Sequence, residues 1–194
     1  MMNWKTIFNP FERFDEKLLL LAGTLAVILS IVAGYWTDTA FTSIYRISSI
    51  ENASLGTITV CTLLSFSAAI VILFILGKIL NGKTRIIDIV NTVLISQLFL
   101  ILLQFAGKIS SLKLAGKSVA NYEASPSGTF PFVDFLIMIS MTIISITTLI
   151  YSVTLFYNGF KTATNIKKWQ HIVLFCAVTM ISSLICQIII NKII

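Results

Sequence analysis

Charged side chains are scarce in this sequence. Its 194 residues include only 14 Lys and Arg and 8 Asp and Glu, so that 11% are charged and 57% are hydrophobic. Soluble domains carry roughly 25% charged residues, and a chain of this size still exposes much of its side-chain area after folding. With a mean hydropathy of +0.94, the composition is typical of a protein that lies in lipid.

Residues for metal or nucleotide chemistry are also few. The single histidine, His171, has no histidine or carboxylate close by in the sequence, and the three cysteines form no CxxC pair. Cys61, Cys176 and Cys186 lie inside apolar runs, where a thiol behaves as a small hydrophobic group. Neither GxxxxGK(S/T) nor GxGxxG occurs. We therefore expect no metal, no cofactor and no enzymatic activity.

The formal charge of +6 could indicate nucleic-acid binding. However, the basic residues occur singly or in pairs between apolar runs, without interleaved aromatic residues. Orientation in an anionic membrane explains the charge better, and no nucleic-acid partner is expected.

Five uncharged apolar runs are long enough to cross a membrane, which takes about 20 residues. They cover roughly Leu18–Tyr35, Thr57–Gly77, Ile89–Ala106, Phe135–Phe156 and Ile172–Ile190. We predict an all-α integral membrane protein, with one domain over residues 1–194 that forms a bundle of five transmembrane helices. A cleaved signal peptide is the alternative for the first run, but Asp15 and Glu16 directly before it and the lack of an A-x-A site argue against cleavage.

The basic residues predict an orientation through the excess of Lys and Arg in cytosolic segments. Five spans place the termini on opposite sides, and nine of the basic residues lie on the N-terminal side against five on the other. The nine are Lys5, Arg13, Lys17, Lys78, Lys83, Arg85, Lys161, Lys167 and Lys168; the five are Arg46, Lys108, Lys113, Lys117 and Lys192. We expect a cytosolic N-terminus and a C-terminus on the opposite side.

Aromatic residues are concentrated before the first span. Trp4, Phe8, Phe11 and Phe14 recur at helical spacing with charged residues between them. The Asn-Pro-Phe-Glu sequence at residues 9–12 is typical of a helix start, with Asn as N-cap and Pro at the first position. We predict a short amphipathic helix in the membrane interface over about residues 4–16; the alternative is an aromatic anchor without regular helix.

The first span carries small residues at every fourth position: Ala22, Ala26, Ser30 and Gly34. Such a stripe lets two helix backbones approach closely in lipid. Its partner is either another span of the same chain, which we favour, or a second copy.

The third span contains two amides, Gln97 and Gln104, which are seven residues apart and share a helix face. An amide within a membrane needs a hydrogen-bond partner, so both should face the bundle interior. They serve either as structural hydrogen-bonding groups or as the lining of a cavity for a small polar ligand. No span contains Asp, Glu, Lys, Arg or His, which argues against ion-coupled transport.

The two loops on the predicted cytosolic side have similar sequences. Each combines an Asn-Gly pair with Lys, Thr and further basic residues, and Asn-Gly permits a left-handed turn after a helix. The candidate residues for contact with partners or lipids are Asn81, Gly82, Lys83, Arg85, Asn158, Gly159, Lys161, Asn165, Lys167 and Lys168.

Three pieces of the chain, 9–12, 77–91 and 157–165, together with the five-span layout, resemble the Yip family. These membrane proteins are named for interaction with Ypt/Rab GTPases. The resemblance implies five helices, a cytosolic N-terminus, no catalytic residues and a role as membrane scaffold or trafficking adaptor. About 17 residues precede the first span, whereas eukaryotic members carry a long N-terminal region. A short bacterial-type member, in a bacterial inner membrane, is therefore expected.

The leading hypothesis is a non-enzymatic scaffold or adaptor that holds membrane lipids, other membrane proteins or a second copy of itself through its cytosolic loops. The alternative is a small permease or channel with a polar path between the third, fourth and fifth spans.

Overall fold

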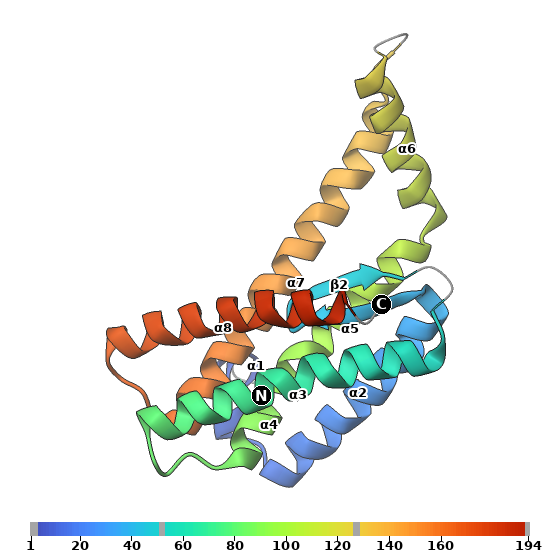
Figure 1. Ribbon diagram of the computed structural model, residues 1–194. Coiled ribbons are helices and arrows are strands. Elements are labelled where there is room, and N and C mark those ends of the chain that lie inside the picture. The colour runs from blue at the N-terminus through green and yellow to red at the C-terminus, as the bar shows by residue number, and fades with distance from the viewer. Residues whose placement is uncertain (1–3, 51–52, 126–128, 193–194) are drawn as a thin grey trace.

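The computed structural model describes residues 4–50, 53–125 and 129–192, and these are mostly helical (Figure 1). The elements in chain order are α1 (Trp4–Phe8), η1 (Pro10–Glu12), α2 (Glu16–Thr37), β1 (Thr39–Ser43), β2 (Arg46–Ser49), α3 (Leu55–Leu80), α4 (Ile86–Gln97), η2 (Leu98–Leu100), α5 (Ile101–Gln104), η3 (Phe105–Lys108), α6 (Ser110–Ala124), α7 (Phe132–Thr164) and α8 (Trp169–Ile190), where η marks a 3₁₀ turn.

The five predicted spans are confirmed. Among the described residues, five helical segments are long and apolar enough to cross a membrane: α2, α3, the run from α4 to η3, α7 and α8. The third of these is not a regular helix, because 3₁₀ turns interrupt it at Leu98–Leu100 and Phe105–Lys108. Every predicted apolar run lies within its segment, and the helices extend beyond the runs at one or both ends.

Helix α7 is the longest element. Its 33 residues span about 50 Å at 1.5 Å per residue, more than the roughly 30 Å of a hydrocarbon core. Its most apolar window is not buried by the rest of the chain. The N-terminal half of α7 and the antiparallel α6 form a helical hairpin that projects from the other helices (Figure 1). The segment between the third and fourth spans is therefore largely helix α6, whose 15 residues were not predicted to be helical.

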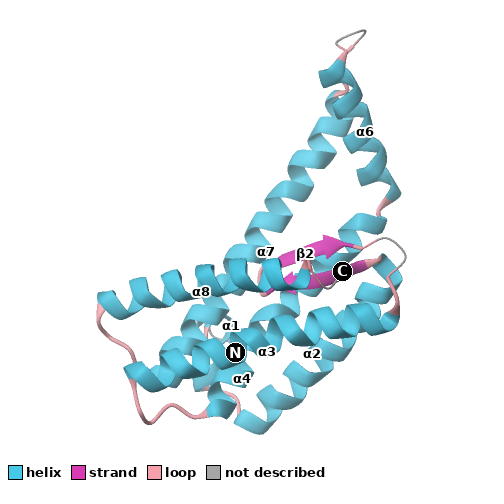
Figure 2. Ribbon diagram, in the orientation of Figure 1, coloured by secondary structure: helices cyan, strands magenta, loops and turns pink. Residues whose placement is uncertain are grey.

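An antiparallel β-hairpin, which the sequence did not predict, follows α2 (Figure 2). All five residues of β1 are buried. Phe41 O accepts a hydrogen bond of 2.8 Å from Ser65 Oγ, and Ser65 lies ten residues into α3, about 15 Å along the helix axis. Strand β1 thus enters the bundle, where the surrounding residues bury it, as non-helical chain within a membrane requires, whereas β2 is exposed at both of its ends.

The small-residue stripe of α2 packs within the chain. Ala26, Ser30 and Gly34 are buried, whereas Ala22 is half-buried. A Cβ on Gly34 would lie 2.5 Å from Thr39 O and 3.2 Å from Gln104 Nε2. The stripe therefore lies against the hairpin and the third span, where close approach requires small side chains.

Candidate functional site

One end of the bundle, here called the N-terminal end, is where α2, α4 and α8 begin and α3 and α7 finish. The three sequence pieces 9–12, 77–91 and 157–165 come from different parts of the chain, and all three lie at this end. Their contacts define the candidate site.

The N-terminal segment is attached to α7. Helix α1 finishes at Phe8, and the last carbonyls of a helix have no partners within it. Ile7 O accepts a hydrogen bond from Tyr151 Oη, and Phe8 O accepts one from Asn158 Nδ2, each at 2.8 Å. Asn158 therefore acts as a structural cap for α1.

The helix predicted over residues 4–16 is divided. Asn9 and Pro10 separate α1 from a 3₁₀ turn of three residues, in which Pro10 occupies the first position as expected. The Asn9 side chain does not cap this turn. Instead, its Nδ2 donates a hydrogen bond to Thr162 Oγ1 at 3.4 Å. Contact with α7 has taken the place of the predicted local cap.

Gly159 does not form the turn that the Asn-Gly pair predicted. It lies inside α7, and a Cβ there would be 2.6 Å from Thr92 Oγ1 and 2.9 Å from Phe11 Cε2. Because it has no side chain, Gly159 allows α7, α4 and the N-terminal segment to pack closely together. The left-handed residue that follows α7 is Asn165, with φ of 50°.

Asn81 connects the two loops. Its Nδ2 donates to Thr164 O at 3.1 Å, and its Oδ1 accepts from Lys83 N at 3.1 Å. Thr84 Oγ1 donates to Gly77 O at 3.0 Å, while Gly82 is exposed with open space around its Cα. The first loop is thereby held against the C-terminal end of α7.

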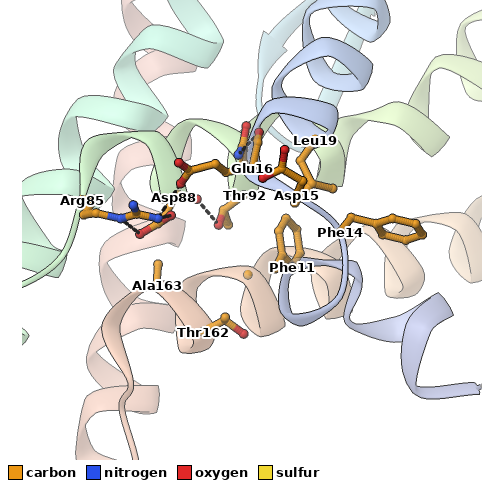
Figure 3. A pocket seen from close by; sticks show the side chains of 12 residues that line it. Phe11, Phe14, Asp15, Glu16, Leu19, Arg85, Asp88, Thr92, Thr162 and Ala163 are labelled. Carbon is orange, nitrogen blue, oxygen red and sulfur yellow. Dashed lines mark hydrogen bonds and ion pairs between the residues drawn. The ribbon is translucent and has the colours of Figure 1, made fainter.

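A charged pocket of about 400 Å³ lies between these segments (Figure 3). It is lined by Phe11, Phe14, Asp15, Glu16, Leu19, Arg85, Asp88, Asn91, Thr92, Gly159, Thr162 and Ala163. Arg85 Nη2 lies 2.9 Å from Asp88 Oδ1 and 2.6 Å from Glu16 Oε2. Hydrogen bonding to Asp88, together with the charges of Asp88 and Glu16, raises the pKa of the Arg85 guanidinium. In the view of Figure 3, Phe11 and Phe14 lie on the side away from Arg85.

The other basic candidates surround this end without entering the pocket. Lys83, Lys161, Lys167 and Lys168 are exposed, and none forms an ion pair with another described residue. Lys161 Nζ lies 5.9 Å from the centre of the Tyr157 ring. Unlike Arg85, these four lysines are available to meet anionic groups outside the protein.

A family model described as the Yip1 domain matches residues 4–190. The chain belongs to the Yip family. The resemblance drawn from the sequence is therefore confirmed, and the five apolar helices make this Yip protein a multi-pass integral membrane protein. No curated protein and no solved structure matches the chain.

The two amides of the third span lie in the interior of this Yip protein. Gln97 is 2% exposed and Gln104 is fully buried. Gln97 Nε2 donates to Ser96 Oγ at 3.2 Å, but Gln97 Oε1 and both amide atoms of Gln104 have no hydrogen-bond partner among the described residues. Such unpaired buried groups are costly in a membrane. The interior therefore contains unused hydrogen-bonding capacity.

Sequence reasoning did not select several residues of the charged pocket. Three of them are acidic residues that lie just before or within the first turn of an apolar helix: Asp15, Glu16 and Asp88. The positive end of the helix dipole stabilises a carboxylate at such a position. An acidic residue at the start of an otherwise uncharged run was the available signal. It gave no indication that Glu16 and Asp88 would share Arg85.

Proposed function

We propose that this Yip protein is a non-enzymatic membrane scaffold or adaptor that acts at the N-terminal end of its bundle. The observation that carries the proposal is the convergence there of the three sequence pieces, held together by Asn81, Asn158 and Gly159. Around them, Lys83, Lys161, Lys167 and Lys168 remain exposed, which provides a fixed basic surface on a rigid support.

The proposal includes an orientation. The N-terminal end carries the majority of the basic residues, and cytosolic segments of membrane proteins are enriched in Lys and Arg. We place this end in the cytosol, with the C-terminus on the opposite side of a bacterial inner membrane. The partners are then anionic lipids of the inner leaflet, other membrane proteins or a second copy, with about 1 kcal/mol of attraction to anionic lipid per basic residue.

The experiment compares two triple variants of the full chain. Lys83, Lys167 and Lys168 are changed together to Gln at the N-terminal end; the matched control changes Lys113, Lys117 and Lys192, which are also exposed. Arg85 is left unchanged because its guanidinium is already paired with Glu16 and Asp88. The proposal expects the first variant alone to lose co-purifying anionic lipid and cross-links to neighbouring membrane proteins. Equal retention by both variants contradicts it.

The permease alternative has one observation in its favour, the unpaired amide atoms of Gln97 and Gln104. It is tested with Gln97→Cys and Gln104→Cys in a chain whose Cys61, Cys176 and Cys186 are replaced by Ala. Labelling by a membrane-impermeant thiol reagent from either side would support a polar path. Protection from both sides, with Lys83→Cys labelled as the accessible control, rules against it.

A further inference from the structure

An apolar groove of about 520 Å³ adjoins the charged pocket. It lies between the N-terminal segment, α2, the third span and α7, and its walls include Ile7, Ala22, Leu98 and Tyr151. Phe14 and Leu19 line both the groove and the pocket. Leu98 is twelve residues beyond the start of α4, about 18 Å at 1.5 Å per residue. The groove thus extends from the charged pocket toward the middle of the membrane.

The pocket has a net negative formal charge. Its charged lining residues are Asp15, Glu16, Asp88 and Arg85, which sum to −2. Arg85 is shared by Glu16 and Asp88, whereas Asp15 forms no ion pair with the described residues and its side chain does not cap α2. A positively charged group is therefore the electrostatic complement of this pocket.

The same pocket also contains an unpaired hydrogen-bond acceptor. Asn91 is 2% exposed, and its Nδ2 donates to Glu16 O at 3.0 Å. That bond fixes which atom is the nitrogen, so the other atom, Oδ1, is an acceptor; it is buried and has no partner among the described residues. A buried acceptor without a donor costs about 1–3 kcal/mol. A group bound in this pocket would pair with Asn91 Oδ1 if it carries N–H or O–H.

We propose that the groove and the pocket together bind one phospholipid with a primary-ammonium headgroup, the chemistry of phosphatidylethanolamine. The ammonium group binds to the Asp15 carboxylate and to Asn91 Oδ1. One acyl chain lies along the groove, which begins at Phe14. Arg13 and Lys17 are exposed on either side of Asp15 and Glu16 in the sequence, and they supply positive charge for the lipid phosphate. This site is distinct from the lysine surface of the proposed function, so each can fail without the other.

A lipid fits these hollows better than a soluble amine because the apolar groove continues directly from the charged pocket. Phosphatidylcholine has the positive charge but no N–H to give to Asn91, and phosphatidylglycerol has hydroxyl donors but no positive charge. The site should therefore distinguish three lipids of identical acyl chains by their headgroups alone.

The test is native mass spectrometry of the full chain, released from detergent with equal amounts of these three lipids. The expected result is retention of phosphatidylethanolamine about tenfold above phosphatidylcholine, a difference of about 1.4 kcal/mol. Phosphatidylglycerol is anionic and is also attracted by the exposed lysines, so it is compared in the chain with Lys83, Lys167 and Lys168 changed to Gln, where phosphatidylethanolamine should again be retained about tenfold above it. Asp15→Asn should abolish the preference, whereas Asp134→Asn, the same change in the first turn of α7, should not. Equal retention of phosphatidylethanolamine and phosphatidylcholine by the unmodified protein overturns the proposal, and this outcome does not depend on any variant.

The groove is tested separately. Ala22→Phe fills it and should reduce retention of phosphatidylethanolamine about tenfold, whereas Ala177→Phe on the exposed side of α8 should leave it unchanged. Unchanged retention in Ala22→Phe, with folding verified by thermal unfolding, contradicts the assignment of the acyl chain. Free ethanolamine is added in a further arm: displacement of the lipid at equal concentration would show that the pocket binds a soluble amine, which also overturns the proposal.

Discussion

Arg85 Nη2 lies 2.6 Å from Glu16 Oε2, joining the beginnings of α2 and α4 across 69 positions of sequence. The side chains of Arg85 and Glu16 are 60% and 41% exposed, and water screens the attraction between exposed charges. Exposed ion pairs typically contribute about 0–1 kcal/mol. The cluster therefore sets the charge around the pocket more than it stabilises the fold.

Removing this ion pair should have little effect on stability. A double-mutant cycle of Arg85→Gln and Glu16→Gln is expected to give a coupling free energy below about 1 kcal/mol, measured by thermal unfolding in detergent. The matched control is Lys108 with Asp38, whose atoms are 2.8 Å apart and similarly exposed. A coupling of several kcal/mol for Arg85 and Glu16 alone would contradict the surface assignment.

The spans could be predicted because lipid imposes a strong local constraint on sequence. A helix that crosses a membrane must be predominantly apolar, so a long run without charge can be recognised without knowledge of its neighbours. The burial of Gln97 and Gln104 follows from the same constraint. Both inferences depend on residues within one segment.

The hairpin and the pocket could not be predicted in this way, because each depends on distant residues. Phe41 O is paired by Ser65, and Ser43 Oγ accepts from Ser183 at 2.9 Å. The prediction of a turn at Gly159 was wrong for a similar reason. Gly159 packs against Thr92 and Phe11 from other parts of the chain, and this packing outweighed the local preference of Asn-Gly for a turn. Tertiary contact overrode the local pattern in both places.

Gly159→Ala should destabilise the protein. The added methyl group would lie 2.6 Å from Thr92 Oγ1 and 2.7 Å from Thr92 Cγ2, and a β-branched side chain cannot rotate both atoms away. Overpacking of this kind costs about 1–3 kcal/mol, which exceeds the gain of up to about 1 kcal/mol from replacing glycine within a helix. The measurement is the midpoint of thermal unfolding in a chain whose exposed Cys176 is replaced by Ala, followed by a dye that reacts with the buried Cys61 and Cys186.

Gly82→Ala is the control for that experiment. Its Cβ would meet no atom within 4 Å, so the unfolding midpoint should remain within the error of the wild type. If Gly82→Ala and Gly159→Ala shift the midpoint equally, close approach at Gly159 is not the cause.

Asn165 should tolerate glycine better than alanine. Its φ of 50° is left-handed, a conformation that costs most non-glycine residues about 1–2 kcal/mol. Asn165→Ala is expected to lower the free energy of unfolding by about 1 kcal/mol, and Asn165→Gly to leave it nearly unchanged. Chemical unfolding in mixed micelles measures both. A larger loss for Gly than for Ala would show that the asparagine side chain, and not the backbone, determines the stability at this position.

Gln104→Met should stabilise the protein. The glutamine side chain is fully buried, and both of its amide atoms lack partners among the described residues. Methionine has similar length and adapts to irregular spaces. Removing an unpaired buried amide should therefore raise the free energy of unfolding by about 1–3 kcal/mol. The matched control is Gln187→Met, which should lower stability because that amide accepts from Arg46 at 2.8 Å and donates to Ser43 at 3.3 Å. A loss of stability in Gln104→Met as large as in the control would show that water or a solute pairs with the amide inside the bundle, which would strengthen the permease alternative.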